Sequence, residues 1–580
     1  MGVIATAVAD GTATARNAPT AALDTTYLQD SIETARALIA KVGAADGSGP
    51  VRGVHEYMGV WYAFRDNLAG TAGLMYKQSA TGWVLQDLGN RISFAGANDG
   101  STVAYVEGET ITGTTSGATA VIKRVVVTNN LGVWGANGAI DVEGYFVIGD
   151  VTGGPFQAEE TTGSTAGVVT ITGAETANTL AAGGRYEFFN DNFFGSSLTK
   201  RMYGVNGVSE AFEWDGTVFV PIITGNTIDT PQHIVVNEFH LQLSFPNGSL
   251  QNSATGTPYI WAGGGAAEIG VGHDIVGLSK EVGQVLIILC RNYTFGLYGK
   301  NTTAAPWDLK VISEESGGIE WTIQRLGATR YLDDRGFMSL AAVQEFGDFG
   351  DTSYSQIIEP LVTSLKTSVV SSVIVKNKHQ YRTFFSDGTG IIATFNNKEL
   401  AGFTVMNYLD ESGTSIPVSV VGNGEGPDGA EVLYFGSTNG YVYQMDSGPS
   451  FDGDSVDATM IWSYYNAGSP AYNKDWKKVT IEADGSTGTT ILYNTQYDYA
   501  SGKEPVGITL SKELQAGGSY WDQAIWDAFS WSGEDITQIE GDISGIGRTV
   551  SLQISSSSTY TIPHTLYAAT LHYIRRKLVR

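Results

Sequence analysis

The chain of 580 residues contains a single cysteine, which excludes several kinds of protein. One thiol forms no intrachain disulfide and cannot supply a cysteine cluster for zinc or an iron–sulfur centre. Cys290 lies in the run VLIILCRNYTF (285–295), which is typical of a buried strand. A buried thiol behaves as a small apolar side chain, so we expect a core residue there and no reactive group.

Long apolar runs are also missing. The longest, VLIILC, is far shorter than the roughly 20 residues that a membrane-spanning helix needs. The N-terminal MGVIATAVADG lacks the basic segment and apolar core of a signal peptide. We therefore expect no membrane span, no membrane anchor and no secretion signal.

Positive charge is scarce. The chain has 34 Lys and Arg against 60 Asp and Glu, for a net charge of −26. Proteins that bind nucleic acid tightly neutralise its phosphates with Lys and Arg, and this composition argues against that class. An acidic surface past which DNA moves without binding is still compatible with it, because like charges repel.

Recognisable catalytic and metal motifs are absent. Seven histidines occur, and none has a ligand spacing such as HExxH; their positions are 55, 233, 240, 273, 379, 564 and 572. There is no GxSxG elbow and no P-loop, and no spacing selects a pair of carboxylates for glycoside hydrolysis. We expect no enzyme and no cofactor.

One acidic turn is the best candidate for a metal site. The segment DSGPSFDGDSVD (446–457) brings Asp452, Asp454 and Asp457 close together in sequence, and oxygen ligands suit Ca²⁺. The segment lacks the EF-hand pattern and its bidentate Glu. A solvated turn is therefore the favoured interpretation.

Glycine, aromatic and β-branched residues are abundant, and they alternate in short runs around turns. GVNGVSEAFEWDG (204–216) and GSTNGYVYQMDSG (436–448) share one plan: an Asn-Gly turn, a short aromatic-containing run, then Asp and Gly. Similar units recur at roughly 40–50 residues, the period of propeller blades. The pattern predicts an all-β protein with a β-propeller over 53–95 and 186–445, and a β-sandwich with many hairpins is the alternative.

Residues 96–185 differ from this pattern, being rich in Gly and Thr and nearly free of aromatics. GETITGTTSGATAVI (108–122) is echoed by EETTGSTAGVVTIT (159–172), so that Gly113 and Gly117 match Gly163 and Gly167. The internal repeat predicts a small β module inserted into the first blade.

The ends of the chain complete the predicted organisation. Residues 1–52 are expected to form an arm with a helix over 24–43, and a second helix is expected over 359–370 after Pro360. Residues 446–580 have longer alternating strands, which predict a C-terminal antiparallel β-sandwich or platform.

Several segments, taken in order, resemble the β-propeller tail proteins of tailed bacteriophages. They are RYLDDRGFMSLAAVQEFGDF (330–349), IIEPLVTSL (357–365), YFGSTNGYVYQMDSGPSFDGDSVDATMIW (434–462) and GSPAYNKDWKKVTIE (468–482). The nozzle protein of short-tailed phages, tail tubular protein B, is the most similar in kind, and the resemblance covers about 200–580. The Gly/Thr-rich repeat looks like small β modules that decorate phage structural proteins.

The resemblance implies a ring of identical subunits, usually six, at the distal end of a phage tail. Such a ring docks on an adaptor ring, meets tail fibres or spikes, and surrounds the channel through which DNA leaves. It belongs to the virion and assembles in the cytoplasm of the host bacterium, which suits a chain without disulfides or signal peptide.

The C-terminal RRKLVR is the one basic run in this acidic chain. Its charged residues are Arg575, Arg576, Lys577 and Arg580. We expect either an assembly contact with acidic surfaces of a neighbouring subunit or a solvated tail. For the whole chain, the alternatives to a nozzle are a receptor- or carbohydrate-binding tail component and, third, a propeller glycosidase.

Overall fold

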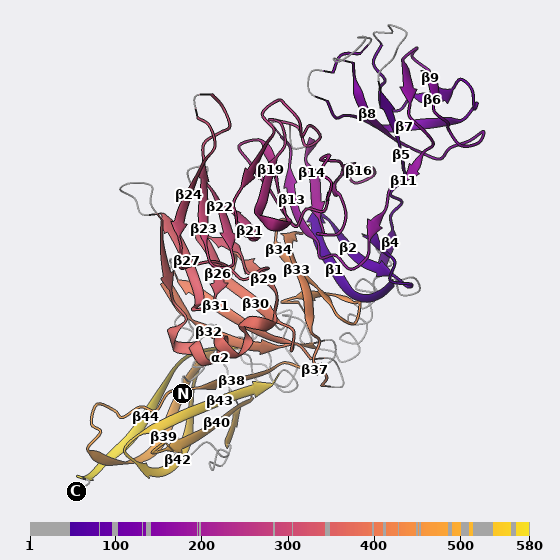
Figure 1. Ribbon diagram of the computed structural model, residues 1–580. Coiled ribbons are helices and arrows are strands. Elements are labelled where there is room, and N and C mark those ends of the chain that lie inside the picture. Colours follow the sequence, from indigo (N-terminus) through magenta and orange to yellow (C-terminus); the bar gives the residue numbers. More distant parts are fainter. Residues whose placement is uncertain are drawn as a thin grey trace. The chain divides into compact units, whose positions relative to one another are not determined.

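The computed structural model describes residues 47–578 except for a set of internal segments, and almost all described residues are strands and turns (Figure 1). The segments outside the description are 80–81, 96–102, 130–131, 135–140, 194, 196–198, 282–284, 304, 343–348, 397–398, 410–412, 427, 448–449, 452–453, 485–489, 500–509, 514–536 and 558–563. The predicted all-β class is confirmed.

Helices are few. Within the described ranges the one α-helix is α2 (Glu359–Leu365), which continues into the short 3-10 helix η5 (Lys366–Ser368). The helix predicted over 359–370 is therefore present but ends earlier, because residues 369 and 370 begin a strand. Two further 3-10 turns are η3 (Pro246–Gly248) and η4 (Gln356–Ile358). The helix predicted over 24–43 lies outside the described residues. No described helix has the length and apolar character needed to cross a membrane.

The chain divides into two compact units. We call Ala40–Ser353 with Ser419–Val442 the N-terminal unit, and Tyr354–Val418 with Tyr443–Arg580 the C-terminal unit. Each is described by itself below, for its described residues.

The N-terminal unit is a succession of sheets, and each sheet is made from strands that are consecutive in the chain. Neighbouring strands within these sheets pair antiparallel. The first sheet contains β1 (Gly47–Tyr57), β2 (Val60–Asn67), β3 (Ala72–Ser79) and β4 (Gly82–Leu85), with β12 (Leu180–Ala181) beside β3. The second contains β13 (Glu187–Asp191), β14 (Arg201–Val205), β15 (Ala211–Trp214) and β16 (Phe219–Ile222). The third contains β17 (His233–Asn237), β18 (His240–Phe245), β19 (Ser249–Asn252) and β20 (Ala267–Gly270).

Three further sheets follow. They contain β21 (Ile275–Lys280), β22 (Leu286–Cys290), β23 (Thr294–Tyr298) and β24 (Asp308–Ser313); β25 (Gln324–Leu326), β26 (Ala328–Asp333), β27 (Gly336–Ala342) and β28 (Phe349–Ser353); and β33 (Val418–Glu425), β34 (Glu431–Ser437) and β35 (Val442–Met445). After Val442, β35 belongs to the C-terminal unit. The first strands β1, β13, β17 and β21 lie beside one another in chain order, and β34 lies beside β1. Apolar side chains of adjacent sheets fill the space between them, and Cys290 is one of these buried residues.

Between β4 and β12 the chain forms a separate closed barrel of six strands. They run in the order β10-β9-β6-β7-β8-β5, and β5 pairs with β10 to close the ring. The strands are β5 (Asn90–Ala95), β6 (Thr110–Gly113), β7 (Thr119–Val127), β8 (Glu143–Ile148), β9 (Glu159–Gly163) and β10 (Val168–Ile171), with β11 (Thr176–Ala177) paired to β5. An apolar core that includes Ile111, Phe146 and Val169 fills the barrel.

The sequence repeat of the barrel is a local two-fold arrangement. β6 and β9 pair antiparallel with Thr112 opposite Thr162, its counterpart 50 positions later. Glu109 accepts hydrogen bonds from the backbone N–H and hydroxyl of Thr165, in the turn after β9. Its counterpart Glu159 accepts them from the turn after β6, including the Ser116 N–H at 2.8 Å. Each repeat therefore caps the turn of the other, which explains why both carry a glutamate at this place.

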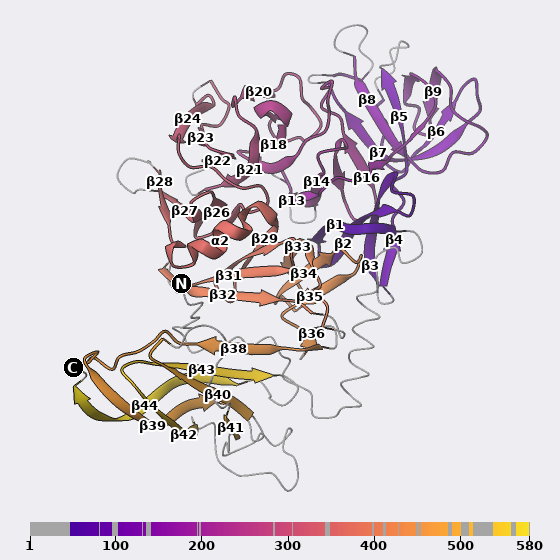
Figure 2. The ribbon, with the colours of Figure 1, turned by 60° about the horizontal axis from the view of Figure 1, so that its bottom comes forward.

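The C-terminal unit contains one four-stranded sheet, α2 and a two-layer β structure. The sheet is β29 (Val369–Val375), β30 (Gln380–Phe385), β31 (Thr389–Asn396) and β32 (Glu399–Asn407). The two layers are β38 (Asp457–Ile461), β43 (Val550–Ser557), β40 (Thr490–Tyr497) and β41 (Leu510–Glu513), and β42 (Thr537–Gly547), β39 (Tyr472–Asp484) and β44 (Thr565–Leu578). A small ribbon of β36 (Ser450–Phe451) and β37 (Asp454–Ser455) precedes them. The layers share one apolar core that includes Trp476. Figure 2 shows the strands of the two layers.

Candidate functional site

A change of face within β7 places Arg124 outside the barrel. Ala120 and Ile122 point into the barrel core, as period two requires for the even positions. The pairing of β7 with β8 then shifts between Ile122 and Arg124. Such a bulge reverses which positions face the core. Val126 accordingly packs outside the barrel, in a cluster that includes Val220 of the second sheet.

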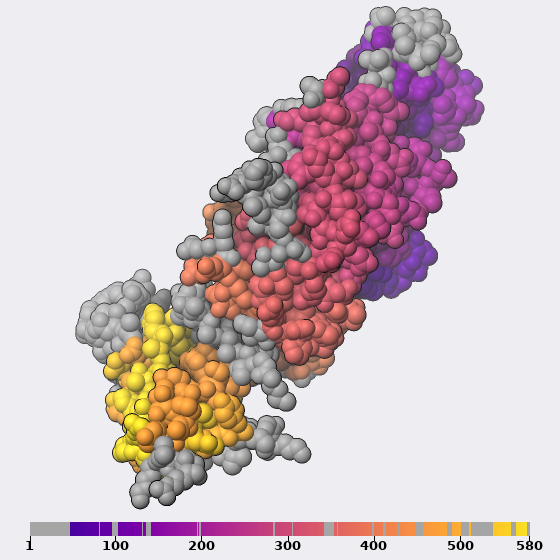
Figure 3. Space-filling view, turned by 60° about the vertical axis from the view of Figure 1, so that its left-hand side comes forward, coloured from indigo at the N-terminus to yellow at the C-terminus, as the bar shows by residue number. Residues whose placement is uncertain are grey.

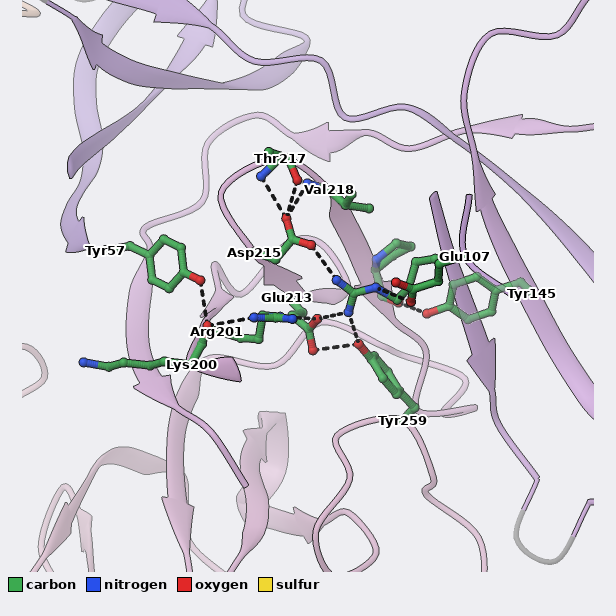
Figure 4. Close-up of polar contacts among 12 residues, drawn as sticks. Tyr57, Glu107, Tyr145, Lys200, Arg201, Glu213, Asp215, Thr217, Val218 and Tyr259 are labelled. Atoms are coloured by element: carbon green, nitrogen blue, oxygen red, sulfur yellow. Dashed lines mark hydrogen bonds and ion pairs between the residues drawn. The ribbon is translucent and has the colours of Figure 1, made fainter. Parts of the chain in front are cut away.

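Arg124 binds three carboxylates that lie on both sides of this junction, those of Glu107, Glu213 and Asp215, which Figure 4 labels. Its Nη1 is 2.6 Å from Glu213 Oε1 and its Nη2 is 2.5 Å from Asp215 Oδ2. Its Nε is 3.0 Å from Oε1 of Glu107 in the barrel. Glu213 lies on β15 and Asp215 directly follows it, so one guanidinium joins the barrel to the second sheet. Burial opposes the charge of Arg124, but the carboxylates outweigh this and raise its pKa above the ordinary value.

The remaining oxygen atoms of Glu213 and Asp215 are also bound. The Tyr259 hydroxyl donates to Glu213 Oε2 at 2.6 Å, and Arg201 Nε lies 3.6 Å from Glu213 Oε1. The N–H groups of Thr217 and Val218 donate to Asp215 Oδ1 at 2.8 and 2.7 Å. Burial alone would raise the pKa of Asp215, but these N–H donors, together with Arg124, lower it overall.

The Arg124 cluster joins the barrel to the second sheet, and its buried groups are poorly placed to act on a substrate. The Glu213 side chain is 3% exposed and that of Arg124 is 11% exposed. A general acid or base must reach the proton that it transfers, and a nucleophile must reach its target. Tyr259, whose pKa is raised by burial and then by the charge of Glu213, holds its proton and donates it in a hydrogen bond. The cluster's chemistry is therefore that of a buried ion pair.

A second buried arginine lies in the C-terminal unit. Arg382 on β30 is 1% exposed and donates to both oxygens of Asp446, at 3.0 and 2.6 Å. Lys378 Nζ adds a contact of 2.8 Å to Asp446 Oδ2. Burial would raise the pKa of Asp446, but Arg382 and then Lys378 lower it. Asp446 opens the acidic segment 446–457, which the sequence suggested to be solvated; this first aspartate is instead a buried ion-pair partner.

The predicted acidic turn lies just beyond Asp446. Asp454 begins the short strand β37 and Asp457 is exposed at the start of β38, whereas Asp452 lies outside the described residues. In the described part of the chain, no three His, Cys, Asp or Glu side chains are grouped to hold a metal ion.

The predicted basic run lies on β44, apart from Arg580, which is outside the described residues. The guanidinium of Arg575 lies 3.5 Å from the ring centre of Tyr472, and Arg576 forms an ion pair with Asp475. Lys577 is the next residue of the strand. The two arginines thus contact β39 of their own chain while remaining exposed.

A small pocket lies at the β17–β18 turn of the N-terminal unit. Its volume is about 130 Å³, and its lining residues are Asp191, Asn192, Val236, Glu238, Phe239 and Lys280. Pockets for drug-sized ligands usually measure about 300–1,000 Å³. This one is too small to enclose a sugar chain.

No sequence motif marked Arg124, Glu213 or Asp446 as functional. A signal for Arg124 was present, because it shares the parity of the core residues Ala120 and Ile122, whereas the other charged residue of the strand, Lys123, has the opposite parity. The parity rule alone would have placed Arg124 inside the barrel, and only the bulge resolves the conflict. No local signal pairs Asp446 with Arg382, because 64 positions separate them.

No family model matches the chain, and no curated protein matches it. One similar solved structure is a crystal structure of the computationally designed Ika8 protein, with 8% identity and a TM-score of 0.31 over 70% of this chain and 99% of the designed one. Another is BBS1N in complex with ARL6DN, with 11% identity and a TM-score of 0.30 over 62% of this chain and 97% of that one. Both TM-scores are below 0.5, so neither likeness supports an argument about this chain.

Proposed function

We propose that this chain is a non-enzymatic structural protein of a short-tailed phage, and that it forms the nozzle ring at the distal end of the tail. Its consecutive four-stranded sheets are the blades of a β-propeller, and its C-terminal two-layer β structure is a platform. Six copies surround the channel through which DNA leaves, under an adaptor ring and beside fibres or spikes.

The order of the sheets is the observation that carries this proposal. Each four-stranded sheet of the N-terminal unit is built from consecutive strands, and the first strands β1, β13, β17 and β21 lie side by side. In a propeller the blades are arranged radially in this way. β34 of the last sheet lies beside β1, which is the contact expected where a propeller closes.

Two further features agree with a conduit. The net charge of −26 disfavours tight contact with DNA phosphates. The arginines at the centres of the two clusters are 11% and 1% exposed and are paired internally, which fits a structural role better than hydrolysis of a glycan.

Sedimentation velocity and negative-stain imaging of the purified chain, alone and with its tail partners, test the proposal. We expect closed rings, most simply hexamers. A chain that stays monomeric at virion-like salt and with the adaptor ring present would rule out the nozzle. Specific binding on a glycan array, without rings, would favour a carbohydrate-binding tail component instead.

We also propose that the barrel is an inserted module that assembly does not need. The chain leaves the first sheet after β4 and returns to it at β12, so a short linker can replace the barrel. The deletion must begin before β5, since β5 is a barrel strand, and it should carry Glu213→Gln to avoid an unpaired carboxylate. Rings should still form. Loss of the fold would show that the barrel belongs to the propeller core.

A further inference from the structure

The three-stranded sheet β42-β39-β44 of the C-terminal unit has two long outer strands. β42, β39 and β44 contain 11, 13 and 14 residues, and each outer strand pairs only with β39 among the residues described (Figure 2). A strand paired on one side presents a row of unpaired N–H and C=O groups on the other. This sheet therefore has two open edges of similar length.

β44 has little of the protection that isolated proteins usually give an edge. Its first ten residues, TLYAATLHYI, contain no proline and no Lys, Arg, Asp or Glu. Tyr567 is 49% exposed and Ile574 is 59% exposed. Yellow residues, the colour of both β43 and β44, are visible at the surface of this part in the space-filling view (Figure 3). A long apolar edge of this kind is stable in solution only when something covers it.

The charges of the two edges identify what covers it. β44 ends in Arg575, Arg576 and Lys577, the basic run of an acidic chain. β42, on the opposite side of β39, carries Glu540 and Asp542 on its exposed positions. The internal contacts of these residues leave them accessible: the Arg576 side chain is 52% exposed and that of Glu540 is 58% exposed. One sheet thus has a basic end on one edge and an acidic stretch on the other. Arg575 lies opposite Lys474 of β39 and Asp542 opposite Lys478, so these charges meet when neighbouring copies of the sheet are staggered along the strand direction.

We propose that β44 of one subunit pairs with β42 of the next, so that the sheet continues from copy to copy. This inference rests on the proposed ring, because a contact between two different edges is head-to-tail and closes only in a ring. β42 and β44 both run antiparallel to β39 and hence parallel to each other. Under rotation about a ring axis, the strands that meet at the interface therefore form a parallel pair.

Two charge-reversal variants of the full chain test the pairing. The first is Arg575→Glu with Arg576→Glu, which makes both edges acidic. The second is Glu540→Lys with Asp542→Lys, which makes both edges basic. Because like charges then meet at the interface, we expect each variant alone to need an about tenfold or higher concentration for half-assembly, measured by sedimentation velocity. An equal mixture should assemble like wild type, because each acidic β44 meets a basic β42.

The matched control is Lys123→Glu with Lys310→Glu, which changes the net charge by the same amount as the first variant, at two exposed lysines of the N-terminal unit. It should assemble normally. Circular dichroism checks that every variant is folded, and rescue in the mixture excludes misfolding as the cause of failure. If both variants assemble like the wild type, or if only the first variant fails to assemble, the β44–β42 pairing is wrong although the ring itself stands. Absence of rings in the wild type would instead overturn the proposed function.

Discussion

Arg124 and Arg382 each form an ion pair with an aspartate, and each aspartate directly follows the third strand of a sheet. The charges around the two arginines differ. Asp215 follows β15 and Asp446 follows β35. Arg124 contacts the carboxylates of Glu107, Glu213 and Asp215, whereas Arg382 and Lys378 share the carboxylate of Asp446. The first cluster has an excess of anions and the second an excess of cations.

This difference decides what happens when one partner is lost. A carboxylate left without its cation can take up a proton, at the cost of a raised pKa. An arginine cannot lose its proton in a protein. We therefore expect the Arg382 cluster to be the more sensitive of the two, and its sensitivity to be nearly independent of pH.

The largest effect is expected for Asp446→Asn. The change leaves Arg382 charged, buried and without a carboxylate, which costs about 3–5 kcal/mol of unfolding free energy in the C-terminal unit. Asn tolerates the positive φ of 56° at this position, so the backbone is not strained. Urea unfolding followed by circular dichroism measures the cost, and it should be the same at pH 5.5 and pH 8.

Asp457→Asn is the matched control for Asp446→Asn. Asp457 is exposed and belongs to the same acidic segment, so its substitution should change stability by less than about 0.5 kcal/mol. Equal effects at the two positions would mean that the Arg382 pairing contributes nothing, and the comparison of the two clusters would fail.

A smaller and pH-dependent effect is expected for Arg124→Met. Glu213 keeps its bond from Tyr259, and Asp215 keeps its backbone N–H donors, so the loss should be about 2–3 kcal/mol at pH 7.5. Without the cation, a buried carboxylate takes up a proton more readily, so the penalty should shrink as the pH falls toward 5. The neighbouring Lys123→Met, on the exposed face of β7, controls for the loss of one positive charge. A penalty that stays constant with pH would contradict the proposed difference between the clusters.

The two similar turn segments allow a third comparison. Gly440 has φ 87° and Gly207 has φ 73°, so alanine is strained at both. A Cβ at Gly440 would also lie 2.4 Å from Cζ of the buried Arg65, whereas at Gly207 the nearest atom is 3.7 Å away. Gly440→Ala should therefore be less stable than Gly207→Ala by about 1–2 kcal/mol. Equal thermal unfolding midpoints would show that Arg65 moves aside.

The sequence predicted well wherever local chemistry decides the structure. The Asn-Gly turns, the helix after Pro360 and the repeat with Gly113 and Gly163 all follow from short-range patterns, and the structure contains each of them. The reciprocal capping by Glu109 and Glu159 was present in that repeat and went unnoticed, although both glutamates precede their glycine by four positions.

Long-range features were out of reach. Barrel closure depends on the pairing of β5 with β10, whose partners Phe94 and Ile171 are far apart in sequence. The face change at Arg124 depends on a bulge that no residue type announces. The burial of Asp446 depends on Arg382, which comes from another hairpin. In each case packing between distant segments overrides what the local pattern indicates.

The smallest expected effect concerns two buried histidines, where the contrast of charge surroundings recurs. His55 faces the neutral amide of Asn190, and burial lowers its pKa to about 4. His233 is buried too, but the carboxylate of Glu187, at 2.7 Å, raises its pKa overall. The unfolded chain protonates both near pH 6.5. Stability from His55 is therefore lost as the pH falls from 6.5 toward 4, and stability from His233 is lost as the pH rises above 6.5 through its folded pKa.

In unfolding midpoints measured from pH 5 to 8, His55→Gln should remove the acid-side loss, about 1 kcal/mol between pH 7 and 5.5, and His233→Gln the alkaline-side loss. Parallel pH profiles for the two variants would mean that Glu187 does not set the charge of His233.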